Sequence, residues 1–103
     1  MVHSEPPNQA DPTGLRLEAL GRRIMLMRIN ARPKISQERL AERAGISRSE
    51  LSRIEQGKNP SMAMIYKIAD GLGVHIVDLV DDRMPMPGDQ YRSAQHRPAD
   101  PAS

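Results

Sequence analysis

Hydrogen-bond donors are concentrated in one short segment near the middle of this 103-residue chain. If the segment that starts at Ser47 is a helix, Leu51 and Ile54 form its apolar pair, and the residues left exposed at its start are donors. These exposed donors are Arg48, Ser49, Ser52 and Arg53. Arginine is the side chain best suited to bind O6 and N7 of guanine in a major groove, and a helix N-terminus attracts phosphate. The pattern therefore favours recognition of a nucleic-acid duplex, and the competing interpretation is an ordinary solvated helix surface.

The distribution of charge along the chain is compatible with the same interpretation. The formal net charge is only +2, but residues 22–58 carry ten Lys and Arg against four Asp and Glu. Residues 59–82 carry one Lys against four Asp. A basic middle followed by an acidic segment suggests one face directed at a polyanion, although a solvated helical surface explains the charges equally well.

The residue content excludes or disfavours several classes of site. The chain has no cysteine, so disulfides, thiolate metal sites and cysteine nucleophiles are excluded. The histidines (His3, His75 and His96) lie far apart, and neither a catalytic grouping nor a Gly-rich phosphate loop is present. We therefore expect no metal, no cofactor and no enzyme activity. No apolar run approaches the roughly 20 residues that span a bilayer, and the N-terminus lacks the apolar core of a secretory signal, so we expect a cytoplasmic protein.

The apolar pattern predicts an all-α domain of short helices. Phe and Trp are absent, so the core must consist of aliphatic side chains and methionine, which short helices pack most easily. A first helix is indicated by a stripe at helical spacing and ends before Pro33, because the residue preceding a proline avoids the α region. The stripe consists of Leu17, Leu20, Ile24 and Met27. No two-residue alternation supports a strand.

Serine caps and glycines divide the rest of this domain into four further helices. Ser36, Ser47 and Ser61 are suitable N-caps, while Gly45 and Gly73 supply left-handed turns after the helices that they end. The predicted helices are residues 37–44, the segment from Ser47 to Gln56, residues 62–72 and residues 77–80. The second of these starts with a capping box between Ser47 and Glu50, and the last buries Leu79. The apolar stripe of the third consists of Met62, Ile65, Ile68, Ala69 and Leu72.

Proline-rich segments flank the helical part of the chain. We expect residues 1–13 to be a flexible N-terminal arm and residues 83–103 a flexible C-terminal tail. The folded domain is then residues 14–82.

Three motifs occur together at fixed spacings: QERLAERAGIS at residues 37–47, LSRIEQGKNP at residues 51–60 and IADGLGV at residues 68–74. With these motifs the chain, from about Leu20 to Leu79, resembles the Cro/repressor (XRE-type) helix-turn-helix family. The resemblance implies a five-helix, lambda-repressor-like bundle whose third helix enters the major groove of double-stranded DNA. It also implies a transcriptional regulator, and we expect a repressor.

The resemblance assigns roles to individual side chains. Those expected to face base edges or nearby phosphates are Arg48, Ser49, Ser52 and Arg53. Gln37 matches a glutamine that in the family braces the recognition helix and touches phosphate. Lys58 and Asn59 match positions that contact the DNA backbone.

Glu55 matches a glutamate that in the family pairs with an arginine of the first helix, for which Arg28 is the candidate here. The link between Arg28 and Ser36 looks longer than is usual in the family and contains Pro33. Its extra length adds Arg32 and Lys34 near the expected DNA backbone. We interpret two further arginines of the second helix, Arg39 and Arg43, as ordinary helix-surface charges.

One recognition helix covers only a few base pairs, so we expect a homodimer on two half-sites about 34 Å apart. The candidate self-contact surface is the fifth helix with its flanks: Val74, Ile76, Val77 and Val80, extended by Met84 and Met86.

A second hypothesis for the function is a protein-interaction module, such as a helix-turn-helix antitoxin that blocks a partner toxin. A small toxin-like neighbouring gene would favour it. A third is a regulator whose activity another protein sets.

Overall fold

The computed structural model describes residues 11–83, and five helices are present there. They are α1 (Pro12–Asn30), α2 (Gln37–Ala44), α3 (Arg48–Glu55), α4 (Met62–Leu72) and α5 (Ile76–Val80). No strand occurs within residues 11–83. The prediction of an all-α, five-helix bundle is confirmed. The arm and tail expected at the two ends lie for the most part outside the described residues.

Serine side chains cap α2 and α4 as the sequence predicts. The hydroxyl of Ser36 accepts a hydrogen bond from the backbone N–H of Arg39 at 3.0 Å. The hydroxyl of Ser61 accepts one from the backbone N–H of Met64 at 3.1 Å. Each bond satisfies one of the free N–H groups at the start of a helix.

Helix α1 begins earlier than the sequence analysis predicts, within the segment assigned to the arm. Its N-cap is Asp11, whose Oδ1 accepts a hydrogen bond from the backbone N–H of Gly14 at 2.8 Å. Pro12 is favourable as the first helical residue, because the N–H that it lacks would have no helical partner there. At the other end, α1 stops at Asn30, and the following peptide bond between Arg32 and Pro33 is cis.

The core contains one fully buried side chain from each helix. These are Ile24, Leu40, Leu51, Ile68 and Leu79. Ile35, from the link between α1 and α2, also joins the core, a role that the sequence analysis did not assign. Two residues that were expected in the apolar stripes are less buried than predicted. Met62 is exposed because it is the first residue of α4, at the edge of the bundle, and Leu17 is only half-buried.

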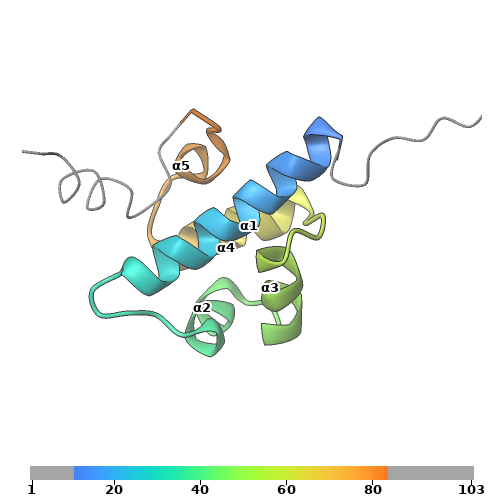
Figure 1. The fold of residues 1–103 in the computed structure, drawn as a ribbon. Helices are drawn as coiled ribbons and strands as arrows, with labels where there is room; N and C mark the ends of the chain where they lie inside the picture. The colour runs from blue at the N-terminus through green and yellow to red at the C-terminus, as the bar shows by residue number, and fades with distance from the viewer. Residues whose placement is uncertain (1–10, 84–103) are drawn as a thin grey trace, which may run out of the picture.

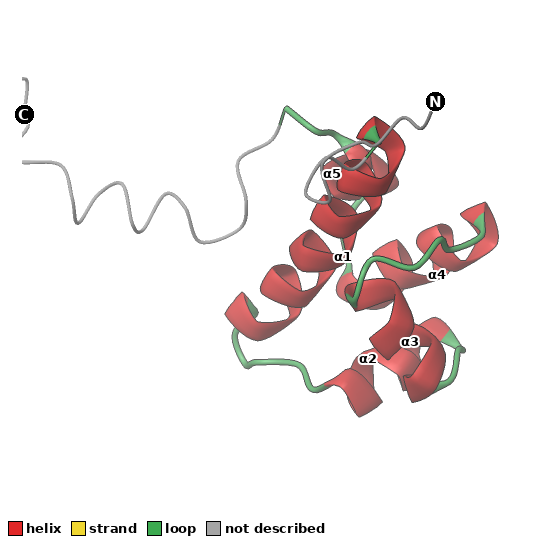
Figure 2. Ribbon diagram, turned by 45° about the vertical axis from the view of Figure 1, so that its right-hand side comes forward, coloured by secondary structure: helices red, strands yellow, loops and turns green. Residues whose placement is uncertain are grey.

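Helix α1 lies in the middle of the arrangement, with α2 and α3 on one side of it and α5 on the other (Figures 1 and 2). It contacts both α3 and α5, while α4 contacts α2 and α5. Helices α2 and α3 also contact each other. The two short helices of the central motif are therefore supported from behind by α1 and α4, which leaves one face of α3 open.

Two glycines allow helix backbones to approach closely. A Cβ on Gly21 of α1 would collide with the carbonyl oxygen of Ile54 and lie 2.7 Å from that of Glu55. A Cβ on Gly71 of α4 would lie 2.9 Å from Cδ1 of Leu40 in α2. Backbone atoms leave no room for a side chain at Gly21, so this contact requires glycine. At Gly71 the nearest atom is the end of the Leu40 side chain, which can shift, so the contact there is tight but does not require glycine. Neither contact was assigned from the sequence.

We predict that Gly21→Ala lowers the free energy of unfolding by about 1–3 kcal/mol or more, because the new methyl group must push α3 away from α1. The higher helix propensity of alanine, about 1 kcal/mol, offsets only part of this loss. Urea unfolding followed by circular dichroism measures the change. Gly14→Ala is the matched control in the same helix, since its Cβ would meet nothing nearer than Oδ2 of Asp11 at 3.5 Å. Equal stability of the two variants would contradict the close approach.

Candidate nucleic-acid interface

The turn between α2 and α3 is built around Gly45. This residue has φ 72°, in the left-handed region that glycine adopts at low cost. Its N–H donates to the carbonyl of Glu42 at 3.2 Å, and the N–H of Ile46 donates to that of Ala41 at 3.0 Å. These two bonds end α2, and Ile46 then packs against the core. The turn therefore fixes the direction in which α3 starts.

The start of α3 is a capping box, as predicted. The hydroxyl of Ser47 accepts from the backbone N–H of Glu50 at 3.0 Å, and Oε1 of Glu50 accepts from the backbone N–H of Ser47 at 2.9 Å. The hydrogen bond that the Glu50 carboxylate accepts from the Ser47 backbone N–H is the main cause that lowers the pKa of this carboxyl. Glu50 therefore caps the start of α3 in its ionised form, and this is the role assigned to it from the sequence.

The outward face of α3 carries the donors singled out in the sequence. The side chains of Arg48, Ser49 and Arg53 are exposed, whereas Ser52 is half-buried and accepts a hydrogen bond from Nε2 of Gln56 at 3.3 Å. Between them, Leu51 and Ile54 are buried in the core. The two arginines are thus free to move away from the protein surface.

Arg48 forms an ion pair with Glu38 of α2, with Nε and Oε2 3.5 Å apart. The two side chains are 62% and 71% exposed, respectively. A pair so exposed is worth at most about 1 kcal/mol and is weakened by salt. A phosphate or a base edge can therefore displace Glu38 at little cost.

A buried carboxylate connects α3 to the two helices before it. Glu55 accepts two hydrogen bonds from Arg28 of α1, one from Nε to Oε2 and one from Nη2 to Oε1, each 2.9 Å long. It accepts a third, also 2.9 Å, from Nε2 of Gln37 in α2. In the ion pair the Arg28 side chain is 11% exposed and that of Glu55 5%. The pairing of Arg28 with Glu55 therefore forms despite the longer link.

The link tolerates its extra length because it is tied back to the end of α1. The carbonyl of Arg28 accepts hydrogen bonds from the N–H of Ala31 at 3.4 Å and from the N–H of Ile35 at 3.0 Å. Nη1 of Arg28 donates to the carbonyl of Ile35 at 3.1 Å. Residues 32–34 consequently protrude without displacing Ser36 from its place at the start of α2.

Gln37 was expected to brace the recognition helix and to touch phosphate. The bracing contact is the hydrogen bond to Glu55, at the end of α3, and phosphate contact stays a prediction. Lys58 and Asn59 follow α3 with exposed side chains. Their backbone is fixed because the N–H of Lys58 donates to the carbonyl of Arg53 at 3.0 Å. Both residues therefore lie at the opposite end of α3 from Arg48.

Two arginines that the sequence analysis counted in the basic middle of the chain point inward in the structure. Arg23 is buried and donates from Nη1 to the carbonyl of Leu79 at 2.9 Å, so it secures the end of α5. Arg28 is occupied by Glu55. The basic surface is correspondingly smaller than the count of charges along the chain indicates.

Within the described part of the chain, no cluster of three or more histidine, aspartate or glutamate residues is arranged to hold a metal ion. Over the same residues, none of the helices combines the length and the apolar character that crossing a membrane requires.

The helix-turn-helix family matches residues 24–79, more than half of this chain. Among curated relatives, the HTH-type transcriptional regulator y4dJ of Sinorhizobium fredii is 37% identical over 54 residues, covering 52% of this chain and 70% of the relative. The HTH-type transcriptional regulator MJ0272 of Methanocaldococcus jannaschii is 44% identical over 46 residues, covering 44% of this chain and 70% of the relative.

Two solved structures are similar to the whole fold. One is a hypothetical transcription factor, NHTF, from Neisseria, with 29% identity and a TM-score of 0.58, covering 86% of this chain and 95% of that one. The other is from the complex of the SinR protein with the SinI protein, with 29% identity and a TM-score of 0.56, covering 79% of this chain and 82% of the other.

The fold, the capped α2–α3 pair and these likenesses together define a DNA-binding regulator of the helix-turn-helix class. The chain belongs to the helix-turn-helix family, in its Cro/repressor (XRE) type. The resemblance seen in the sequence motifs is thus confirmed.

The buried and the exposed ion pair of this region should differ sharply in their effect on stability. We predict that Glu55→Ala lowers the free energy of unfolding by about 3–5 kcal/mol, because it leaves the Arg28 guanidinium buried without its partner. Glu38→Ala, which removes the exposed partner of Arg48, should cost less than about 1 kcal/mol. Urea unfolding of both variants gives the comparison. A small effect of Glu55→Ala would refute the anchoring role of this carboxylate.

Proposed function

We propose that this protein is a sequence-specific repressor that inserts α3 into the major groove of operator DNA. The observation that carries the proposal is the division of α3 into two faces. Leu51 and Ile54 are fully engaged in the core, while Arg48 and Arg53 project outward from the same eight-residue helix. An α-helix with its side chains is about 10–12 Å in diameter, and this diameter fits a major groove about 12 Å wide.

Each polar side chain on or beside α3 has a role in this proposal. Arg48 and Arg53 read base edges, with guanine as the favoured partner, and Ser49 and Ser52 contact bases or nearby phosphates. Gln37, at the first turn of α2, and the pair Lys58 and Asn59 hold the DNA backbone on either side of the helix. The assignment is supported by the hollow that Gln37 shares with Arg48 and by the position of Lys58 and Asn59 directly after α3.

The comparisons support the regulatory part of the proposal. The curated relatives are themselves described as transcriptional regulators, and the similar structure from Neisseria is described as a transcription factor. Repression follows from the simplest action of a small DNA-binding domain, which occludes a promoter by occupying its operator.

Selection from random duplexes identifies the operator, and variants then separate the roles of the side chains. We predict that Arg48→Ala costs about 1–3 kcal/mol of binding free energy and relaxes preference at one base pair. Lys58→Ala should weaken binding to all sequences alike and lower the steepness of the log–log salt dependence by about one.

Arg83→Ala is the control for this experiment. It removes one positive charge from an exposed side chain that follows α5, and this helix lies on the other side of α1 from α3 (Figure 1). Its affinity and salt dependence should match those of the parent protein. A flat salt response of the parent, or the absence of any preferred sequence, would refute the proposal.

We further propose that the protein acts as a homodimer through α5. Val77 is 60% and Val80 44% exposed. Val74 and Ile76, which were also expected in this surface, instead pack partly against the core. Met84 and Met86 lie outside the described residues. The dimer surface proposed is therefore the outer side of α5, with Val77 and Val80.

Val77→Glu tests the dimer without touching α3. We predict that it converts the protein to a monomer in sedimentation equilibrium, because a charge would be buried in an apolar contact. Affinity for a duplex with two half-sites should fall, while affinity for a single half-site stays unchanged. Unaltered sedimentation of this variant would exclude α5 as the contact between subunits.

A second candidate function is that of a protein-interaction module, which either controls a partner protein or is controlled by one. The similar SinR structure was solved in complex with the SinI protein, and this favours considering such a partner here. Co-purification of one protein at equal stoichiometry, together with loss of operator binding in that complex, would support this role over unassisted repression.

A further inference from the structure

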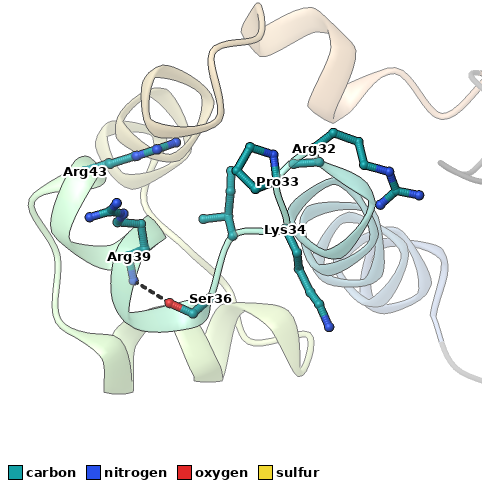
Figure 3. A pocket seen from close by; sticks show the side chains of 8 residues that line it. Arg32, Pro33, Lys34, Ser36, Arg39 and Arg43 are labelled. Carbon is teal, nitrogen blue, oxygen red and sulfur yellow. Dashed lines mark hydrogen bonds between the residues drawn. The ribbon is translucent and has the colours of Figure 1, made fainter.

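A basic hollow of about 370 Å³ lies beside the start of α2, away from the residues assigned to base contact. One wall is the link between α1 and α2, with Arg32, Pro33 and Lys34, and the other is α2 itself, with Arg39 and Arg43 (Figure 3). We call this site the α2 basic hollow. Four of the residues that line it are cations, and no acidic residue does.

The cations of the α2 basic hollow are not neutralised within residues 11–83. The four ion pairs formed there involve Arg16, Arg28, Arg48 and Arg83. None includes Arg32, Lys34, Arg39 or Arg43, all of which have exposed side chains. Four positive charges around one hollow, none of them in an ion pair with another residue of the described part of the chain, produce a local potential that attracts a polyanion.

The α2 basic hollow is continuous with the proposed DNA-binding face. A second hollow, of about 570 Å³, extends from Arg48 at the start of α3 past Gln37 to Lys34. The two hollows share Lys34, Ile35 and Ser36 in their walls. A strand whose phosphates lie at Arg48 and Gln37 can therefore continue around the N-terminus of α2 toward Arg39.

We propose that the α2 basic hollow binds phosphates of the DNA that flanks the operator half-site and so lengthens the footprint beyond the bases that α3 reads. This inference rests on the proposed function. Arg39 and Arg43, one helical turn apart, are the principal contacts, and Arg32 and Lys34 assist from the link. The contacts are independent of base sequence, because the phosphodiester backbone is the same at every step.

The form of the hollow favours a DNA backbone over a small phosphate ligand. Figure 3 shows Arg32 and Lys34 extending away from the link in different directions, so the charged groups do not converge on one point. The hydroxyl of Ser36 is already used as a cap by the N–H of Arg39. Exposed cations without a buried donor are typical of counterion-releasing contacts along a polyelectrolyte.

The test compares two operator duplexes, one ending at the half-sites and one longer by about half a helical turn, roughly 5 base pairs, on each side. The variant is Arg39→Ala/Arg43→Ala, which keeps the Cβ of Arg43 beside Gly71 and introduces a good helix former. The matched control, Arg16→Ala/Arg83→Ala, also removes two positive charges, from exposed side chains near the two ends of the described chain. Circular dichroism and sedimentation verify that all proteins are folded and equally associated.

We predict that the double variant binds the short duplex like the parent but binds the long duplex about tenfold more weakly, with a log–log salt dependence less steep by about two. The control should equal the parent on both duplexes. Equal losses on both duplexes, or no loss on either while the parent still binds its operator, would overturn the inference and leave the proposed function intact.

Two further results would each overturn the inference for a separate physical reason. If tripolyphosphate binds the parent at one per chain and fails to bind the double variant, while duplex length has no effect, the hollow is a small-ligand site and the inference is wrong. If the parent protein binds neither duplex, the proposed function itself fails, and the flanking contact fails with it.

Discussion

The buried carboxylate of Glu55 is the interaction on which the placement of α3 depends. Removing a carboxylate from water is unfavourable, and only a full set of donors compensates for the loss of its hydration. Here Arg28 supplies a two-point contact from α1, and Gln37 supplies one hydrogen bond from α2. Since these donors come from both preceding helices, α3 cannot shift or rotate without breaking charge-assisted bonds in a nearly dry site. The outward direction of Arg48 and Arg53 therefore depends on the hydrogen bonds that hold Glu55 at the other end of the same helix.

Close backbone packing complements this polar anchor. Gly21 lets α1 touch the carbonyl groups at the end of α3, next to the residue that the anchor holds. The polar contact resists rotation of α3, while the steric contact sets its distance from α1. Neither alone specifies a position, because a hydrogen-bonded side chain can still follow a sliding helix. Together they hold α3 on a rigid base, and a rigid base is needed wherever a short helix selects among base pairs by a few hydrogen bonds.

The sequence is sufficient for those features that depend on neighbouring residues. The caps at Ser36 and Ser47 and the turn at Gly45 are local, so their residue types predict them, and the five-helix fold follows from their order. Features that join distant segments were assigned only where the family resemblance supplied them, as for the pairing of Arg28 with Glu55. Gln37 and Glu55 are 18 positions apart, and nothing in either residue type indicates that they meet. Gly21 reads as a weak helix residue until α3 is placed against it. Ile35 sits in a link that looks like a surface loop, yet it is buried because the carbonyl of Arg28 holds that link in place.

The arginines of this protein show why a count of charges is a poor guide to a binding surface. Arg23 and Arg28 have the same side chain as Arg39 and Arg48, but burial against the carbonyl of Leu79 or the carboxylate of Glu55 turns the first two into structural groups. Part of the positive charge that remains outside, including Lys34 and Arg48, lies near the N-termini of α2 and α3, where the helix dipoles add to it, while Arg43 and Arg53 lie in the last turns of these helices. Side-chain charge and helix dipoles thus reinforce each other on one side of the molecule. The acidic residues Asp81 and Asp82, together with Arg16 and Arg83, form paired charges near α5 that contribute little field of their own. A polyanion approaching from any direction is therefore attracted mainly to the side that presents α3.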